Sequence, residues 1–435
     1  MGNIFDMVGS GSWQTDAKPE SWREGILYYW PNGMTSLTGM MSKIPTEPID
    51  SDVHHWWIQE PPIQGGEITA GSVYTDGAME NAYTSGGVAG NQLWLKVSAA
   101  IAGEIKPGHV IQLSSQDYFR MTCNAYVDTV SVNGANSKLG VHLLEDDDND
   151  TASSKDLSDA DYILVIGSGH EQGGPTPKAI AYEPDGYWNW IQDFRNSIYL
   201  TEVAQQVRTR YGSKEYLRIK KMTQRLHGIE MEKATWFGVR HTEQGENNQP
   251  RMFMGGIRWW VQQNADSVYM ADFRQAAAYA GKKWTDADGG KHWLAAMTEQ
   301  YARYAEDENW VGFGGSGALN GINQLANIFG QVNLETRAEA YGIKIRTWVT
   351  ADGELSLKTH PLFSQHPPLR HAIYFVGPRS VRFRPLRNMD TRFRTNRQTR
   401  GETARLDEFQ TVGTLEFGAP RHFMVLYGVG QDNVL

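Results

Sequence analysis

The chain has 435 residues, of which 40% are hydrophobic and 21% charged, which is ordinary for a folded protein with two or three packed units. No stretch approaches the roughly 18 uninterrupted apolar residues of a membrane span, and the first residues resemble no secretion signal, so we expect neither. The one cysteine, Cys123, excludes an internal disulfide and a zinc site built from several cysteines.

Charge is divided unevenly along the chain. Residues 1–200 hold 26 acidic and 10 basic residues, a net charge of −16, whereas residues 201–435 hold 24 and 31, a net charge of +7. Chance variation between domains is one reading of this division. The functional reading is attraction between unlike parts of identical copies, or a basic face turned toward nucleic acid.

Residues 1–60 are irregular in sequence and rich in aromatic side chains. Glycine and proline interrupt them too often for a lasting periodicity, yet a disordered tail would not carry so many aromatics. We interpret them as an N-terminal arm without a core of its own, whose aromatic side chains pack on the rest of the chain or on a neighbouring copy. The candidate arm contacts are Trp13, Trp22, Trp30, Trp56 and Trp57.

Residues 61–200 have the pattern of a β-rich region. Short β-branched runs lie at residues 108–113, 125–132 and 162–166, and Asn133-Gly134 after the second run predicts a hairpin. The acidic run at residues 145–150 is interpreted as a solvated loop tip. Its alternating aspartates resemble half of a calcium loop, but the turn glycine and the final glutamate are missing, so we expect no metal site there.

Residues 213–237 give the clearest helix pattern. Ser213 is a suitable N-cap, and an apolar stripe with a period of about 3.5 follows it. The stripe consists of Ile219, Met222, Leu226, Ile229 and Trp236. At 1.5 Å per residue the helix would be roughly 37 Å long, so we expect a strut across which sheets pack.

Beyond this helix, helical and extended patterns come in separate runs, which predicts an α+β fold. Helices are expected near residues 272–280, 293–305 and 318–329. Strands are expected at residues 342–349, 355–357, 372–376, 381–384, 414–417 and 422–427. A turn at Asp352-Gly353 joins the first two of these strands.

The glycine-rich segment at residues 312–317 matches the letters of a dinucleotide-binding loop. Such a site needs a buried strand just before the first glycine, but polar, helix-like residues precede this segment. We therefore interpret it as a flexible loop that caps the helix starting near Ala318. A nucleotide-binding enzyme is the alternative from a different class; we assign no catalytic, cofactor-binding or metal-binding residue.

An arginine run near the C-terminal end is the clearest charge feature. Its main members are Arg382, Arg384, Arg387, Arg392, Arg394, Arg397 and Arg400. Arginine pairs bidentately with carboxylates and phosphates. Three readings stay open: ion pairs with a neighbouring copy, a solvated face, and contact with the phosphates of DNA.

Several short motifs follow one another in a set order from about residue 185 onward. Asn189-Trp190-Ile191-Gln192-Asp193-Phe194 leads into an extended segment and then into the long helix. The later motifs are residues 250–257, residues 315–321, residues 341–345 and His360-Pro361-Leu362-Phe363. This order resembles that of tailed-bacteriophage major capsid proteins with the Hong Kong 97 fold, in which the long helix is the spine of the peripheral domain.

The resemblance implies five regions along the chain. They are an N-terminal arm at residues 1–60, a β-rich extended-loop region at residues 61–200, a peripheral domain at residues 201–260, an axial domain at residues 261–370, and return strands of both domains at residues 371–435. It also implies a structural protein, not an enzyme, that assembles into hexamers and pentamers. These would form the icosahedral head around double-stranded phage DNA.

The implied partners are further copies of the chain, the portal and scaffolding proteins, a decoration protein, and packaged DNA through non-specific contact. The resemblance implies no cofactor and no membrane contact, and it places the protein in the virion after assembly in the host bacterial cytoplasm. The structural alternative is a portal, tail or adaptor component. A portal would carry long paired helices, whereas the sequence shows one long helix.

Overall fold

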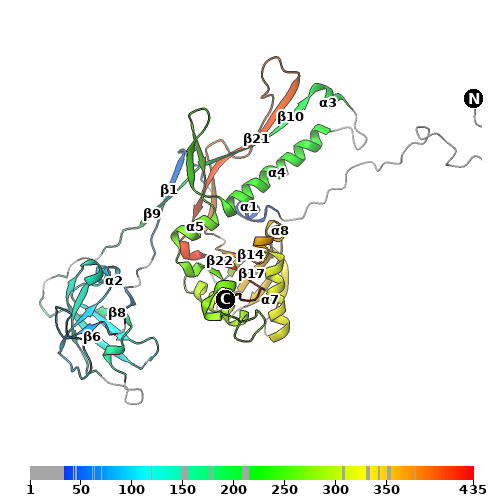
Figure 1. Cartoon of the computed structure of the whole chain (residues 1–435). Helices are drawn as coiled ribbons and strands as arrows, with labels where there is room; N and C mark the ends of the chain where they lie inside the picture. Colours follow the sequence, from blue (N-terminus) through cyan, green and yellow to red (C-terminus); the bar gives the residue numbers. More distant parts are fainter. Residues whose placement is uncertain are drawn as a thin grey trace, which may run out of the picture. The chain divides into compact units, whose positions relative to one another are not determined.

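The computed structural model describes most of the chain in two units. The described residues are 34–42, 44, 47–60, 62, 64–69, 71–118, 120–147, 155–174, 176–177, 179, 181–207, 215–305, 309–329, 334–340, 343–349, 354–377 and 379–435. Unit 1 comprises Met1–Ile58 and Asp185–Leu435, and unit 2 comprises Gln59–Pro184. Ile58 and Asp185 are paired residues of one antiparallel ribbon, so unit 2 is inserted between two adjacent ends of unit 1 (Figure 1).

Unit 2 is built on a seven-stranded antiparallel sheet in the order β2-β8-β5-β6-β7-β4-β3. Its strands are β2 (Gly65–Glu67), β3 (Val73–Tyr74), β4 (Gln92–Lys96), β5 (His109–Ser114), β6 (Thr122–Ser131), β7 (Lys138–Leu143) and β8 (Tyr162–Ser168). The three strands expected from β-branched runs are confirmed as β5, β6 and β8. Alternate residues such as Ile111 and Leu113 are fully buried in a core that also takes Ile101 of helix α2 (Ala99–Glu104).

The described residues of unit 1 form four sheets. Two of these sheets have two strands each: β1 (Val53–Ile58) pairs with β9 (Asp185–Trp190), and β11 (His241–Gln244) pairs with β12 (Pro250–Phe253). In a third sheet, β21 (Ala404–Phe417) pairs with β10 (Gln192–Thr201), β19 (Val381–Pro385) and β20 (Arg392–Arg394). The largest runs in the order β13 (Met270–Asp272), β22 (Phe423–Tyr427), β18 (Ile373–Val376), β14 (Asn309–Gly314), β17 (Glu354–Thr359), β16 (Ile343–Val349) and β15 (Leu334–Ala340). The expected region at residues 61–200 thus also covers β9 and most of β10, which belong to unit 1.

The helices of unit 1 lie among these sheets. They are α1 (Ser36–Met41), α3 (Glu202–Gln206), α4 (Glu215–Phe237), α5 (Ile257–Asn264), α6 (Gly290–Ala302), α7 (Ser316–Phe329) and α8 (Pro361–Gln365). The mixture of helices with mainly antiparallel and mixed sheets confirms the expected α+β class. The expected helices near residues 293–305 and 318–329 are confirmed as α6 and α7, and the six strands expected after residue 340 are confirmed. The turn at Asp352-Gly353 lies outside the described residues.

The core of unit 1 is densely aromatic where the end of α4 meets the large sheet. Trp236 is fully buried, and its ring lies 5.1 to 5.4 Å from those of Phe313, Phe363 and Tyr374, in each case edge to face. Such contacts add to the stabilisation from apolar burial. Strand β18 is buried at all four positions, as expected for a strand covered on both faces.

Helix α4 is the long rod that runs beside β10 and β21 (Figure 1). The expected apolar stripe is wrong at Met222 and Leu226, which are 39% and 37% exposed. Ile219, at its start, is half-buried and packs against Ile198, Leu200 and Phe409. Farther along, the helix faces the sheet with polar residues: His227 bonds to Asn196 of β10 and, at 2.7 Å, to Thr411 of β21. The hydrogen bonds of His227, together with the apolar contacts of Ile219, therefore set how this half of the helix faces the sheet. The stripe fits again in the second half, where Ile229 and Trp236 are buried.

The helix expected near residues 272–280 is also wrong. Strand β13 ends at Asp272, and two 3-10 turns follow, Phe273–Gln275 and Ala277–Tyr279. The Asp272 side chain accepts a hydrogen bond from the backbone N–H of Arg274. The side-chain amide of Asn433 donates to the backbone carbonyls of Phe273 and Ala276. These contacts occupy the backbone groups that a continuous helix would use.

Candidate functional site

The ribbon of β1 and β9 has one buried and one exposed aromatic face. Trp56 is 9% exposed, and its ring lies 5.7 Å from Trp260 and 6.4 Å from Phe417 in the core of unit 1. Trp57 points the other way, is 72% exposed, and lies over Gly186, where a Cβ would stand 2.9 Å from its ring. Of the expected arm contacts, Trp56 therefore packs on its own chain. Trp13, Trp22 and Trp30 lie outside the described residues.

Beside the exposed face stands an arginine that the sequence did not single out. The guanidinium of Arg240 lies 3.8 Å from the ring centre of Trp188 and 4.6 Å from that of Trp259, and it donates to the carbonyl oxygen of Trp188 at 2.8 Å. Burial lowers the pKa of Arg240. Among the described residues, no carboxylate lies within ion-pair distance of this cation. Nothing in the local sequence, Val239-Arg240-His241, indicates that Arg240 lies between two tryptophan rings.

The arginine run divides into paired and unpaired members. Within the chain, Arg384 pairs with Glu416 at 2.6 Å, Arg387 with Asp50 at 2.8 Å, and Arg397 with Glu408 at 3.4 Å. In the part of the chain that the structure describes, no carboxylate pairs with the remaining members. These are Arg382, Arg392, Arg394 and Arg400. Of them, Arg392 and Arg400 are exposed, and Arg382 and Arg394 are half-buried.

Glu416 holds the innermost of these pairs. Burial would raise its pKa, but hydrogen bonds from His54 at 2.9 Å and from Arg384, together with their charge, bring the pKa down to about 2. The carboxylate therefore stays ionised and ties β1 to β19 and β21. Arg384 is therefore bonded within the subunit, an arrangement that none of the three readings of the arginine run included.

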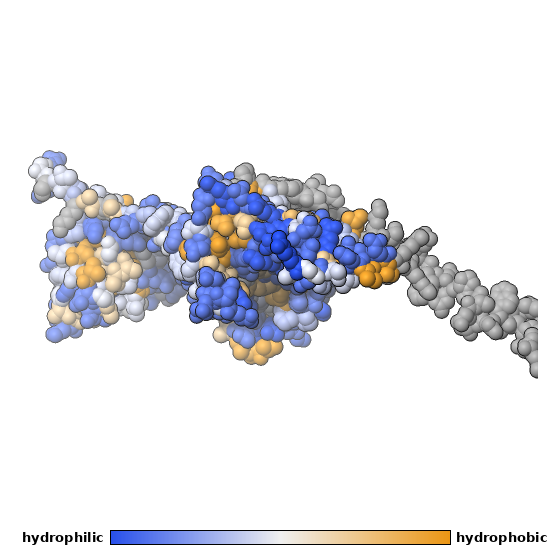
Figure 2. Space-filling model, turned by 90° about the horizontal axis from the view of Figure 1, so that it is seen from above, coloured by the Kyte–Doolittle hydropathy of each residue, from blue (hydrophilic) through white to orange (hydrophobic). Residues whose placement is uncertain are grey.

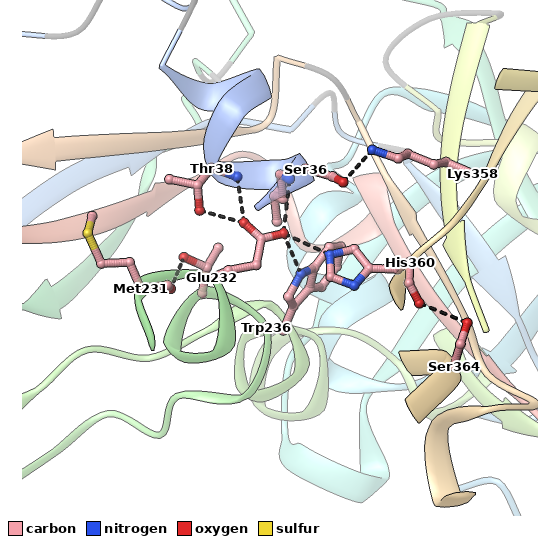
Figure 3. Close-up of polar contacts among 10 residues, drawn as sticks. Ser36, Thr38, Met231, Glu232, Trp236, Lys358, His360 and Ser364 are labelled. Carbon is pink, nitrogen blue, oxygen red and sulfur yellow. Dashed lines mark hydrogen bonds and ion pairs between the residues drawn. The ribbon is translucent and has the colours of Figure 1, made fainter. Parts of the chain in front are cut away.

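A second polar site lies inside unit 1, around Glu232 of α4 (Figure 3). This side chain is fully buried. One carboxylate oxygen accepts hydrogen bonds from the Leu37 amide at 2.9 Å, Trp236 Nε1 at 3.1 Å and His360 Nε2 at 2.9 Å. The other accepts from the amide and hydroxyl of Thr38. Glu232 thus caps the first turn of α1, where Thr35 makes no side-chain cap.

The ionisation of this cluster follows from its contacts. Burial would raise the pKa of Glu232, but the bond and charge of His360, together with the bonds from Thr38, hold it below the usual value. Nearby, Lys358 donates to the Ser36 hydroxyl, and burial lowers the pKa of Lys358 to about 8. A carboxylate has about four lone-pair positions, and five donors already use them. The arrangement is therefore suited to fastening α1, rather than to binding a substrate or a metal.

The glycine segment at residues 312–317 is not the flexible loop that we expected. Gly312 and Gly314 lie in the central strand β14, and α7 begins at Ser316. A Cβ at Gly312 would stand 2.8 Å from Leu357, and one at Gly315 would stand 2.3 Å from the carbonyl oxygen of Arg370. The first amides of α7 are bonded within the protein, Ser316 to Ser364 and Ala318 to Arg370. Close packing therefore accounts for these glycines.

Two aspartates of the acidic run in unit 2 fasten loops, although Glu145 and Asp146 are exposed, as expected for a solvated loop. Asp146 accepts from the Ala89 amide at 2.8 Å, and Asp147 accepts from the Leu157 amide at 3.1 Å and from the Tyr83 hydroxyl; Asp148 and Asp150 lie outside the described residues. Within the described ranges, no group of three His, Cys, Asp or Glu residues could hold a metal ion. None of the helices described there is long and apolar enough to cross a membrane.

Comparison with known proteins identifies the class as a viral shell protein. Residues 12–430 match a family model described as SU10 major capsid protein. The match spans nearly all of the chain, and the protein belongs to this family of phage major capsid proteins. The resemblance to phage major capsid proteins expected from the motifs after residue 185 is thereby confirmed.

Individual relatives are more distant. The major capsid protein of Pseudomonas phage PaMx41 is 28% identical over 203 residues, which is 46% of this chain and 46% of that relative. The alignment thus spans about half the length of that protein. A solved structure from Mycobacterium phage Bobi shares 9% identity over 95% of this chain and 96% of its own, with a TM-score of 0.43. One from Mycobacterium phage Adephagia shares 10% over 96% and 93%, with a TM-score of 0.38.

Proposed function

We propose that this protein is the main building block of a tailed-phage head. Copies assemble into hexamers and pentamers, which form an icosahedral shell of the Hong Kong 97 type around double-stranded DNA. The family match over residues 12–430 carries this proposal. The exposed aromatic face at Trp57 and the arginines without a described carboxylate partner support it, because both are surfaces that association would cover.

Within this proposal the parts of the chain have separate tasks. The peripheral domain, residues 201–260 with the spine α4, and the axial domain, residues 261–370, form the wall together with the return strands at residues 371–435. Residues 61–200 form an extended loop carrying a β-rich elaboration; unit 2 supports the elaboration, whereas β9 and β10 at its end belong to unit 1. The arm at residues 1–60 contributes Trp13, Trp22, Trp30 and Trp57 to contacts between copies.

The proposed partners follow from the task of a shell. They are further copies, the portal and scaffolding proteins, a decoration protein on the outer surface, and DNA through non-specific contact. Assembly takes place in the host bacterial cytoplasm, and the product is part of the virion. The role is structural and needs no catalytic step. The saturated hydrogen bonding around Glu232 is in keeping with that role.

The proposal is tested by expressing the protein alone and with its scaffolding protein, and by imaging the products by negative-stain electron microscopy. We expect shells, rings of capsomers or misassembled tubes. A chain that stays monomeric at high concentration, even with its phage partners present, contradicts the proposal.

The arginine run needs its own experiment. The charge reversals Arg392→Glu and Arg394→Glu together change two arginines that have no described carboxylate partner. Folding is checked by circular dichroism, and Arg303→Glu, at an exposed position directly after α6, serves as the control. A folded subunit that no longer assembles indicates ion pairs between copies. Normal empty shells that retain DNA poorly, with a strong salt dependence, indicate phosphate contact. Filled virions of normal yield indicate a solvated face.

A further inference from the structure

The outward face of the β1/β9 ribbon is an aromatic surface that the described residues cover only in part, because Arg240 lies over Trp188 while Trp57 stays exposed. It is formed by His55 and Trp57 of β1 and by Trp188 and Trp190 of β9, which face the same way by strand alternation. Trp57 is 72% exposed, and the rings of Trp188 and Trp190 meet edge to face at 5.3 Å. The opposite face of the ribbon is closed by the core of unit 1 through Trp56. An aromatic surface of this kind marks a site of association.

Arg240 adds one specific requirement to this surface. Its guanidinium is fixed between the rings of Trp188 and Trp259, and one of its donors is used by the Trp188 carbonyl. A guanidinium has five N–H donors in one plane, so donors remain at its edge. A carboxylate accepts two of them side by side, and this paired contact is much stronger in a partly buried place than in water. The surface thus fits a partner that presents a carboxylate next to apolar side chains.

The chain itself carries a surface of matching charge. Residues 59–184, which form unit 2, include 17 acidic and 6 basic residues, a net charge of −11; the rest of the chain has 33 acidic and 35 basic residues, a net charge of +2. Unit 2 also exposes apolar side chains, among them Leu164 and Ile166 of β8. A second copy can therefore offer both features that the ribbon face requires.

We propose that the ribbon face around Trp57 and Arg240 is the docking site for the acidic unit 2 of a second copy. A carboxylate of unit 2 accepts two hydrogen bonds side by side from free N–H groups on one edge of the Arg240 guanidinium, and apolar side chains of unit 2 cover Trp57. This inference rests on the proposed function, since it requires that copies assemble. It goes beyond that function by naming the two surfaces that meet.

The first test compares assembly by Arg240→Gln, Trp57→Ala and the control Arg303→Gln, which removes an exposed arginine that directly follows α6 and pairs with Glu299 of that helix. Loss of a charge from a desolvated interfacial pair should raise the protein concentration needed for assembly by roughly tenfold or more. The control should assemble as the wild type does, and thermal unfolding should show that all three variants fold. A folded Arg240→Gln protein that assembles at the wild-type concentration overturns the proposal.

The second test identifies the partner surface directly. Arg240→Lys places an amine at position 240, and a zero-length carbodiimide then links it to a carboxylate in contact. Shells are assembled from a mixture of ¹⁴N-labelled and ¹⁵N-labelled chains, and mass spectrometry locates the link. We expect links between different chains, from position 240 to an Asp or Glu within residues 59–184. Links within one chain, links to another region, or no link at position 240 overturn the proposal.

Two further outcomes have distinct meanings. A folded Arg240→Lys protein that does not assemble supports the proposal, because lysine keeps the charge but lacks the planar fork. Normal shells of Arg240→Gln that lose only their DNA overturn it in favour of nucleic acid, for which arginine and tryptophan also form stacking surfaces. If the wild type itself never assembles, the proposed function fails, and that result is separate from any effect of position 240.

Discussion

The two ends of α4 show how differently one helix can be used. At its C-terminal end, Glu232 and Trp236 are enclosed, one capping α1 and the other packing against the large sheet. At its N-terminal end, Met222 and Leu226 are exposed, and Lys220 lies 3.6 Å from the ring centre of Phe393 on β20. The first end is a core element and the second is a surface strut. Substitutions at the two ends should therefore separate stability from assembly.

The largest expected effect comes from the length of an N-terminal deletion. Removing residues 1–51 takes away α1 with the buried Leu37 and Met41, each contributing about 2 kcal/mol. It also leaves Glu232 without the Leu37 and Thr38 donors, which are worth about 1.5–3 kcal/mol each. We expect a loss of roughly 5 kcal/mol or more in the free energy of unfolding, measured by urea titration.

Removing only residues 1–33 is the matched control, because it keeps every described contact of α1. We expect its free energy of unfolding to stay within about 1 kcal/mol of the wild type, while assembly weakens. Equal stability of the two deletions would show that α1 does not belong to the subunit core.

Trp236 gives the next largest effect. Trp236→Ala empties a fully buried position among three aromatic rings and should cost about 3–5 kcal/mol. Met222→Ala, at the exposed end of the same helix, should cost less than about 1 kcal/mol. Chemical denaturation of both variants checks the contrast, and a large cost at Met222 would mean that the N-terminal end is also part of the core.

Two residues one turn apart, Leu226 and Ile229, test where α4 changes from an exposed helix to a part of the core. Ile229→Ala removes a buried side chain and should cost about 2–5 kcal/mol, whereas Leu226→Ala, one turn earlier and 37% exposed, should cost below about 1 kcal/mol. Lys221→Ala, also exposed, should be neutral. Similar costs at Leu226 and Ile229 would restore the continuous stripe and contradict the rotation seen here.

The smallest expected difference is in the pH dependence of stability. The pKa of Glu232 is lower in the folded protein than its ordinary value of 4.5, so the unfolded chain binds the proton more readily. The stability from this group is present above about pH 4.5 and is lost as the pH falls through the folded pKa. In Glu232→Gln the decline of unfolding temperature between about pH 5 and pH 3 should be shallower than in the wild type. Glu215→Gln, at the other end of α4, should change the slope less.

Local patterns predicted most elements, because strands and helices with a single apolar or β-branched pattern are specified by neighbouring residues. Met222 and Leu226 of α4 were mispredicted as buried because His227 and Thr411, which lie 184 positions apart, bond across the helix–sheet contact. The segment at residues 272–280 was mispredicted because Asn433, near the other end of the chain, binds its carbonyls. In both cases a tertiary contact overrides local preference.

The candidate sites follow the same rule. The sequence shows that arginines are concentrated after residue 379, but only the fold shows that Arg384 meets Glu416 and that Arg387 meets Asp50. The partners of Glu232 lie 128 to 195 positions away, except for Trp236. Arg240 carries no sequence signal, because its two tryptophans come from β9 and α5. The glycines at residues 312–317 match a motif by letter, while their cause is packing between β14 and its neighbours.

The chain enters and leaves unit 2 at Ile58 and Asp185, and this junction affects how such shells can evolve. These two residues face each other on one ribbon, so the chain enters and leaves unit 2 at a single strand pair. Unit 2 is a β-sheet module with a hydrophobic core of its own. Modules whose ends lie close together can be exchanged without threading the host fold. A foreign domain of similar design, grafted between these two residues, should be displayed once per subunit, and related phages could acquire new surfaces by the same route while the wall stays unchanged.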